Sequence, residues 1–464
     1  MSHGIGPYFH RDLIKQLKRC EKFVLCFDEQ TNVQNKKQLD LLIKFWSYGE
    51  GLVVTRYYKS VMLGHTQAHV LQDAIINSFK TDGINLKRLL MLERDNPFVN
   101  ISLENLIDEE MKKIESGLLL LGSGNLHSVH NGFKTGISSA NWHVENICTE
   151  IYSWFKQSPA RKEDLVDTID EFDDLVEKTL LYFTITRWIL LGKVIARVLT
   201  LWEPLNEYFL IFLPTCQKAQ IRKNDKYEKI KSNLTSNVSK IRLHFVLFLC
   251  ETIFDRFLTW FQQEGPLIHL LHHELSELFH LVSLQFLKSD YVADKSGSDL
   301  LDLDFNADQI IRVARAVPHL LTDNEIDHLR NEWLIYSYET IDEKWIIKSQ
   351  EKDSSGNDHI IYQRIDFYWN NVLAITLSDG RSKYPTFSKL VKNILIISHG
   401  NADIERGFSI NENIVTTNRS SLSELSINGL RTTYDAVKFS GGGFSHKACI
   451  DSFDFEKLHL YFYV

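Results

Sequence analysis

The sequence has little of what marks secreted or membrane-bound proteins. Its 464 residues include only 8 prolines and 22 glycines, so long flexible linkers are not expected. The 6 cysteines are scattered without a Cys-x-x-Cys pair, which indicates reduced thiols in an intracellular protein rather than a disulfide framework. No apolar run reaches the roughly 18 residues that a membrane span needs, so the sequence predicts no membrane contact.

Positive charge is also scarce. Lys and Arg number 52 against 60 Asp and Glu, which gives a formal net charge of -8. The chain as a whole is therefore not an electrostatic nucleic-acid binder, and any contact with DNA must use a local basic patch. Apolar residues are abundant instead, at 44%, which is enough for two or three packed cores in a chain of this length.

Apolar runs that end in an acid alternate with helical patterns over the first 140 residues. FVLCFD predicts a strand that ends at Asp28, followed by a polar segment and an extended run, GLVVTRYYKSVMLG. AHVLQDAIINSF predicts an amphipathic helix, and LKRLLMLERD ends on Asp95 as the first run ends on Asp28. A further buried run is expected in LLLLGSG. Strands that alternate with helices predict an α/β sheet.

The remainder of the chain has a different pattern. From about residue 140 the apolar spacing becomes that of long helices, and EKWIIKSQEKDSSGNDHIIYQRIDF predicts a β-hairpin around a Ser-Ser-Gly-Asn turn. We therefore predict that residues 1–140 form the first part of the sheet domain. Residues 141–370 are then a mainly helical insertion with a hairpin near 344–368, residues 371–437 complete the core, and residues 438–464 form a tail.

Asp28 and Asp95 are the first candidates for chemistry. Two acids at the ends of strands can meet at one end of a sheet, and their carboxylates then repel unless a cation lies between them. Hard oxygen ligands of this kind suit Mg²⁺ or Mn²⁺, and such ions support phosphoryl displacement. Because Asp is also common in turns, a pair of turn residues without metal remains open on these two residues alone.

The order of motifs resembles the catalytic core of the hAT transposase superfamily. The resemblance runs from about Phe23 to Val437 and rests on FDEQTN, KQLDLLIKFW, LERDNPFVN, GSGNLHSVHNGF, TRW and HGNADIERGFS. It implies an RNase H-like α/β core interrupted by a large all-helical insertion, with metal-dependent cleavage and strand transfer of DNA. It also implies a dimerisation segment within 371–437, hence a homo-oligomer, and a nuclear location follows from DNA as the substrate.

The resemblance assigns three catalytic metal ligands. Asp28 and Asp95 match the family's two aspartates, and Glu405 in ADIERGFS matches its glutamate. Glu29 and Glu93 lie close by but do not occupy the motif positions. For Glu405 the alternative is a surface ion pair with Arg406.

Six further residues are predicted to contact DNA. Arg187 and Trp188 match the family's Arg-Trp pair, which would clamp a phosphate and stack on a flipped base, although Trp188 could equally be a core anchor. His127 matches the histidine of a Cys-x-x-His element whose cysteine position is Gly124 here, and a structural histidine is the alternative. Lys223, Lys226 and Lys229 belong to a basic stretch that could track phosphates or form a solvated face.

Two features favour a different use of the same fold. Gly124 replaces the expected cysteine, and no Cys/His set matches the zinc-binding BED finger that usually precedes the family's core. The alternative function is therefore a domesticated, catalytically silent descendant that binds DNA or protein partners. An unrelated metal nuclease is disfavoured because it would not predict the ERGFS and TRW contexts.

Overall fold

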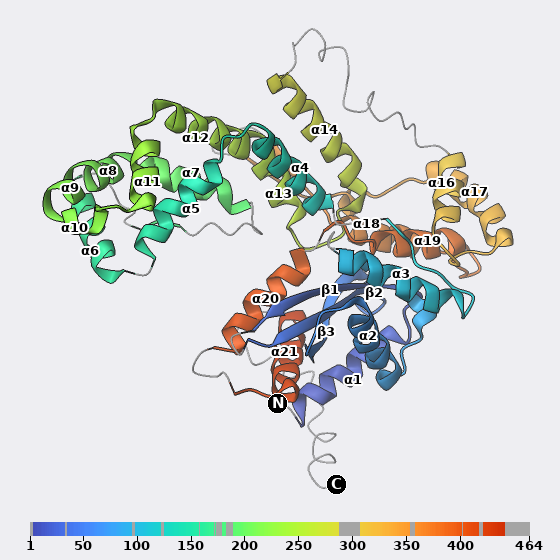
Figure 1. Ribbon diagram of the computed structural model, residues 1–464. Coiled ribbons are helices and arrows are strands. Elements are labelled where there is room, and N and C mark those ends of the chain that lie inside the picture. Colours follow the sequence, from blue (N-terminus) through green and yellow to red (C-terminus); the bar gives the residue numbers. More distant parts are fainter. Residues whose placement is uncertain are drawn as a thin grey trace. The chain divides into compact units, whose positions relative to one another are not determined.

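The computed structural model describes residues 3–32, 35–94, 98–121, 125–156, 158–170, 172, 179–181, 189–286, 307–352, 358–400, 402–416 and 421–440. The chain divides into two compact units, each described here by itself (Figure 1). The sheet unit comprises residues 1–127, 261–273 and 301–464, and the helical unit comprises residues 128–260 and 274–300.

A mixed four-stranded sheet forms the centre of the sheet unit. Its strands lie in the order β3-β2-β1-β4. β1 pairs antiparallel with β2, β2 pairs antiparallel with β3, and β4 runs parallel to β1 on the other side. Their bounds are Phe23–Thr31 for β1, Lys37–Ser47 for β2, Leu52–Leu63 for β3 and Leu89–Glu93 for β4.

Alternation along β1 divides the apolar residues between two cores. Because successive side chains of a strand point to opposite faces, Phe23, Leu25 and Phe27 enter one core while Val24 and Cys26 enter the other. The other three strands and three helices supply most of the rest of the first core. The helices are α1 (Ile5–Leu17), α2 (Ala68–Asp82) and α3 (Phe98–Lys112).

Helices from the later part of the chain cover the opposite face of the sheet (Figure 1). Trp46 of β2, Phe387 and Ile404 are all buried in this second core. The helices are α16 (Ala307–Ala316), α17 (Asp323–Ser337), α18 (Ile365–Leu373), α19 (Pro385–Leu395) and α20 (Ala402–Ile414). α20 contacts both β1 and β2, which places it directly over the middle of the sheet.

The outer edge of β3 is covered by α21 (Glu424–Phe439) through polar side chains. Asp435 accepts from the amide of Tyr57 at 3.0 Å, and Asn428 accepts from the amide of Ser60 at 2.8 Å. Glu424 accepts from the amide of Met62 at 2.9 Å. Asp366 of α18 accepts from the amide of Val53, also at 2.9 Å. These acceptors satisfy edge amides that would otherwise be open to pairing with another chain.

The helical unit is held together by an apolar core rich in aromatic rings. Trp154, Tyr208 and Phe209 are each at most 3% exposed within it. The described helices are α4 (Asn125–Ser139), α5 (Val144–Phe155), α6 (Pro159–Asp170), α7 (Ile189–Thr200), α8 (Trp202–Asn206), a π-helical turn (Glu207–Phe212), α9 (Leu213–Cys216), α10 (Lys218–Ile221), α11 (Asp225–Thr235), α12 (Asn237–Leu249), a second π-helical turn (Cys250–Phe254), α13 (Asp255–Phe261) and α14 (Ile268–Phe286). Of these, α4, α13 and α14 contain residues of both units.

Several local predictions can be compared with these elements. The hairpin is confirmed as β5 (Ile347–Lys352) paired antiparallel with β6 (Asp358–Tyr362). The predicted strand end at Asp28 is wrong, because β1 continues to Thr31. β2 lies where the sequence predicts a polar segment, since Gln38, Asp40 and Lys44 alternate with apolar residues.

The run LLLLGSG forms no strand in the part that the structure describes. Leu118 and Leu119 are buried, and the amide of Leu119 donates to the carbonyl of Leu90 in β4 at 2.7 Å. Leu120 and Leu121 are exposed, so the expected buried run ends after two residues.

The mixed α/β class is confirmed, and the units divide the chain at other points than the predicted domains. α16, α17 and the β5–β6 hairpin belong to the sheet unit, although the sequence predicts them in the insertion. α17 packs on α18 and α19 through aromatic residues such as Trp333 and Tyr336. Among the described helices, none is long and apolar enough to cross a membrane.

Candidate active site

Asp28 lies on the face of the sheet that α20 covers. Its side chain follows the alternation of Val24 and Cys26, both of which belong to the core beneath α20. It is partly exposed, and its Oδ1 accepts from the amide of Glu29 at 2.8 Å. Asp28 therefore combines a position over the sheet with access to solvent, as a ligand-binding carboxylate requires.

Asp40 of β2 pairs directly with Asp28 across the two strands. It is fully buried, and its carboxylate accepts from Gln38 Nε2 at 2.8 Å, from Ser60 Oγ at 2.5 Å and from Asn411 of α20. Directly opposed residues have Cβ atoms about 5 Å apart, so Asp40 adds negative potential beside Asp28. A cation at Asp28 would be favoured by both charges.

Asp95 lies outside the described residues, but the strand that precedes it is defined. β4 runs parallel to β1, and Glu93 is in register with Cys26. In the sequence Asp95 follows Glu93 by two positions, as Asp28 follows Cys26. The prediction that Asp28 and Asp95 share one end of the sheet stays a prediction that this parallel register supports.

Glu405 lies in the first turns of α20, as predicted. Ile404, Gly407 and Asn411 of this helix are buried and define the side that faces the sheet. With about 100° of rotation per residue, Glu405 projects from one flank of that side and Asp403 from the other. Asp403 contacts Thr55 of β3, so the opposite flank, with Glu405, is the one toward β1.

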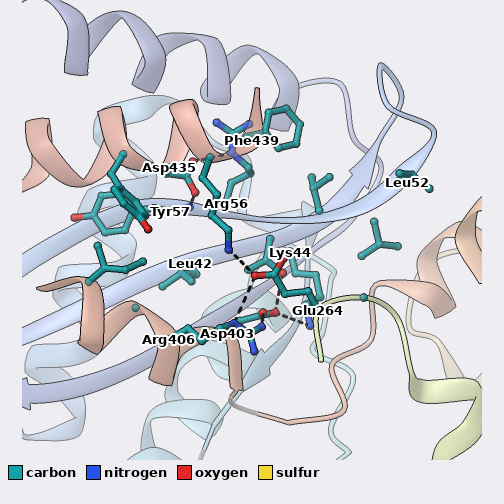
Figure 2. A pocket seen from close by; sticks show the side chains of 18 of the residues that line it. Leu42, Lys44, Leu52, Arg56, Tyr57, Glu264, Asp403, Arg406, Asp435 and Phe439 are labelled. Carbon is teal, nitrogen blue, oxygen red and sulfur yellow. Dashed lines mark hydrogen bonds and ion pairs between the residues drawn. The ribbon is translucent and has the colours of Figure 1, made fainter. Parts of the chain in front are cut away.

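Arg406, the neighbour of Glu405 in the sequence, pairs with two other acids. The carboxylates paired with Arg406 are those of Asp403 and Glu264 (Figure 2). Glu405 is partly buried on α20, and its assignment as a metal ligand and the alternative as a partner of Arg406 both stay predictions.

A buried ion pair fixes the start of α20 on the sheet (Figure 2). Lys44 Nζ lies 3.2 Å from Asp403 Oδ2 and donates to Ser398 Oγ at 3.2 Å. Thr55 Oγ1 donates to the same Asp403 oxygen at 2.8 Å. Burial, the largest single influence, favours a raised pKa for Asp403, but the Lys44 ammonium and the other donors together hold that pKa well below its usual range. This pair sets the rotation of α20 and with it the direction of Glu405.

Two titratable groups beside this pair are buried and have shifted pKa values. Burial raises the pKa of Glu93, although nearby Lys44 opposes the rise. Burial, together with the Lys44 charge, lowers the pKa of His399 to about 3, so its imidazole is neutral near pH 7 and its Nε2 donates to the carbonyl of Phe261 at 3.1 Å. Sequence reasoning assigned no role to Lys44, Asp403 or His399, although Lys44 lies in the motif KQLDLLIKFW and the other two lie in HGNADIERGFS.

The other predicted DNA-binding residues are only partly described. Arg187, Trp188 and Gly124 lie outside the described residues. His127 belongs to α4, but its side chain is not described. Lys223 precedes α11 with a φ of 54°, and Lys226 and Lys229 are exposed on that helix, where Lys229 lies 3.8 Å from Glu150. All three lysines are exposed, so they can reach an anionic partner. A solvated face would expose them in the same way, so both alternatives for this stretch stay open.

Metal binding stays a prediction. Among the described residues, no group of three or more His, Cys, Asp or Glu side chains is gathered as a metal site, and this set does not include Asp95. Asp28 and Glu405 present carboxylate oxygens from neighbouring elements on one side of the sheet. Their chemistry therefore fits the oxygen ligands that Mg²⁺ and Mn²⁺ prefer.

Comparison with known proteins gives one informative result. Residues 371–436 match the hAT family C-terminal dimerisation region. They span the end of α18, all of α19 and α20, and α21 up to Ala436. No curated protein matches the chain. The matched region points to self-association and confirms the resemblance over the segment that carries Glu405.

Proposed function

We propose that this chain, a hAT family transposase-like protein, is an RNase H-like catalytic core that cleaves DNA and transfers strands with the help of divalent metal. The observation that carries the proposal is the arrangement of β1, β4 and α20. β1 and β4 run parallel, α20 packs on β1, and Asp28 lies on the side of the sheet that α20 covers.

In this proposal Asp28, Asp95 and Glu405 hold one or two Mg²⁺ or Mn²⁺ ions. Bound there, the metal would lower the pKa of water and stabilise both oxygens of an in-line phosphoryl displacement. The carboxylates position and do not attack. The Lys44–Asp403 pair acts through α20, because it anchors the turn from which Glu405 projects.

DNA contact is proposed for the helical unit and for His127 of the sheet unit. Arg187 and Trp188 would hold an unpaired base, His127 would neighbour the site, and Lys223, Lys226 and Lys229 would bind phosphates. The logarithm of the DNA-binding constant falls linearly with the logarithm of the salt concentration. Replacing one phosphate-binding lysine by glutamine should make this slope shallower by about 1. A nuclear location and a homo-oligomer built through residues 371–436 complete the proposal, the latter supported by the family match.

The test is cleavage of a labelled hairpin or flanked duplex with Mg²⁺ or Mn²⁺. The wild type should nick the substrate, and Asp28→Ala, Asp95→Ala and Glu405→Gln should lose nicking while they keep DNA binding. Glu412→Gln is the matched control, because Glu412 is an exposed acid on the same helix as Glu405. Undiminished cleavage by Asp95→Ala would refute the metal-site assignment.

The second candidate is the domesticated descendant that binds DNA or protein without cutting. Gly124, at the position of the family's cysteine, favours it. In that case neither the wild type nor Asp28→Ala would cleave under any metal condition, while both would bind the same duplex.

A further inference from the structure

A pocket of about 330 Å³ opens in the sheet unit beside the edge strand β3 (Figure 2). β2, β3, α20 and α21 line it, together with Glu50, Glu264, Gly265 and Arg364. It lies on the Asp403 flank of α20, whereas Glu405 projects from the opposite flank. The pocket is therefore distinct from the candidate metal site.

Arg431 of α21 brings a buried positive charge to this pocket. Its side chain is 3% exposed, its Nη1 donates to the carbonyl of Gly407, and its guanidinium lies 4.5 Å from the centre of the Tyr57 ring. Among the described residues, no carboxylate lies within ion-pair distance of it. A buried charge without a counter-ion is costly, so Arg431 is suited to an anion that enters from outside.

The other cations that line the pocket already have carboxylate partners. Lys44 and Arg406 pair with Asp403, and Lys438 Nζ lies 2.5 Å from Glu264. Arg364 also lines the pocket and pairs with Asp366 at 2.7 Å. Arg56 pairs with Asp435 through Nε at 2.7 Å, which leaves its two terminal nitrogens available to a further acceptor. Positive charge without compensation is thus concentrated at Arg431, with Arg56 as a second donor.

The edge of β3 adds a backbone donor at the same place. Val53 and Tyr57 direct their amides outward to Asp366 and Asp435. Thr55 lies midway between them, so its amide points the same way, and it also lines the pocket. No partner for this amide exists among the described residues. The covering of the edge by side chains is therefore interrupted where the pocket opens.

We propose that this pocket binds a small phosphate monoester, whose phosphate pairs with Arg431 and Arg56 and accepts from the amide of Thr55. The planar fork of arginine matches phosphate oxygens, and the pocket volume lies at the small end of ligand sites. Tyr434 and Phe439 offer apolar surface for the remainder of the molecule. The phosphate of a monoester is terminal and can enter a pocket, whereas a phosphate of the DNA backbone carries a sugar on each side.

The experiment measures binding to the full chain by calorimetry, with inorganic phosphate and deoxyadenosine monophosphate as probes at constant ionic strength. Both probes should bind the wild type, and Arg431→Gln should weaken them about 10- to 100-fold, the effect of removing one charged hydrogen-bonding partner. Arg381→Gln is the matched control, since Arg381 lies in the same matched segment and its side chain is 78% exposed. It should leave binding unchanged.

Stability without ligand separates a binding role from a structural one. If Arg431 serves a ligand, Arg431→Gln should leave the melting temperature unchanged or raised, whereas removal of a purely structural arginine should lower it. Should Arg431→Gln fail to fold, Ile410→Trp fills the pocket from α20 and leaves Arg431 in place, and it should abolish binding of both probes.

Two outcomes would overturn the proposal. One is the absence of heat for both probes with the folded wild type. The other is a duplex that displaces deoxyadenosine monophosphate and itself depends on Arg431, since the phosphate would then belong to DNA. Neither outcome depends on DNA cleavage. A failure of phosphate binding in the pocket can therefore be distinguished from a failure of the proposed function.

Discussion

The two units of this protein are stabilised by different buried chemistry. In the sheet unit, charged residues such as Lys44, Asp40, Glu93 and Arg94 are buried. In the described part of the helical unit, Glu274 at 9% is the one charged side chain in that class, and the core consists of aliphatic and aromatic residues. The sheet unit thus buries charged groups between its strands and helices, whereas apolar packing holds the described part of the helical unit together.

The largest effect is expected from breaking the buried ion pair of the sheet unit. Asp403→Ala leaves Lys44, whose side chain is 4% exposed, without its carboxylate. Removing one partner of a buried pair costs about 3–5 kcal/mol of unfolding free energy. Denaturant unfolding measures the loss, and Asp379→Ala, at an exposed pair with Arg381, should cost at most about 1 kcal/mol. Equal losses in the two variants would contradict a structural role for the buried pair.

A cavity in the helical unit should cost nearly as much, through a different mechanism. Leu205 of α8 is fully buried in the apolar core, so Leu205→Ala should lose about 2–5 kcal/mol. Val238→Ala, on an exposed position of α12, should change stability by less than about 0.5 kcal/mol. Because no charge is involved, the loss at Leu205 should be the same near neutral and mildly acidic pH, and a strong pH dependence would argue against an apolar origin.

Acid should weaken the sheet unit through His399. Its pKa is lowered from 6.5 to about 3 in the folded chain, chiefly by burial. Between these values the unfolded chain binds a proton that the folded chain does not, so stability is complete above pH 6.5 and falls as the pH drops toward about 3. The loss is at most about 1.4 kcal/mol per pH unit.

Unfolding free energies near neutral and mildly acidic pH measure this slope. His399→Gln should flatten it, and His328→Gln should not, because His328 is exposed on α17. A slope that survives in His399→Gln would assign the acid sensitivity to another group.

The smallest effect is expected at the covered edge of β3. Asn428 accepts from the Ser60 amide and donates to the Ser60 carbonyl, each at 2.8 Å. Asn428→Ala leaves both groups unsatisfied and should cost about 1–3 kcal/mol. Asn371→Ala, at an exposed amide that donates to Phe367 of its own helix, is the control. Light scattering measures self-association of the same variant. An increase would show that the side chains of α21 also protect the edge of β3 from pairing with another chain.

The positions of the strands show which parts of the sheet a local sequence pattern can predict. Apolar runs located β1, β3, β4 and the β5–β6 hairpin, since buried strands need such runs. β2 was missed because its alternate residues Gln38, Asp40 and Lys44 look like a solvent face. The structure instead buries that face beneath α20, where Asn411 and Asp403 supply the partners. A polar residue can be buried when its partner is distant in the sequence, and a local pattern cannot reveal that partner.

The sequence by itself determined the candidate catalytic residues, the family motifs and the mixed α/β class, because each depends on residue type and order along the chain. Only the tertiary structure decided that Asp403 anchors α20, that α21 covers the edge of β3 and that Arg431 is buried beside an open pocket. Each of these depends on contacts between residues more than 20 positions apart, such as Lys44 with Asp403 and Arg431 with Gly407. Their energies arise from burial, which the chain acquires only when it folds.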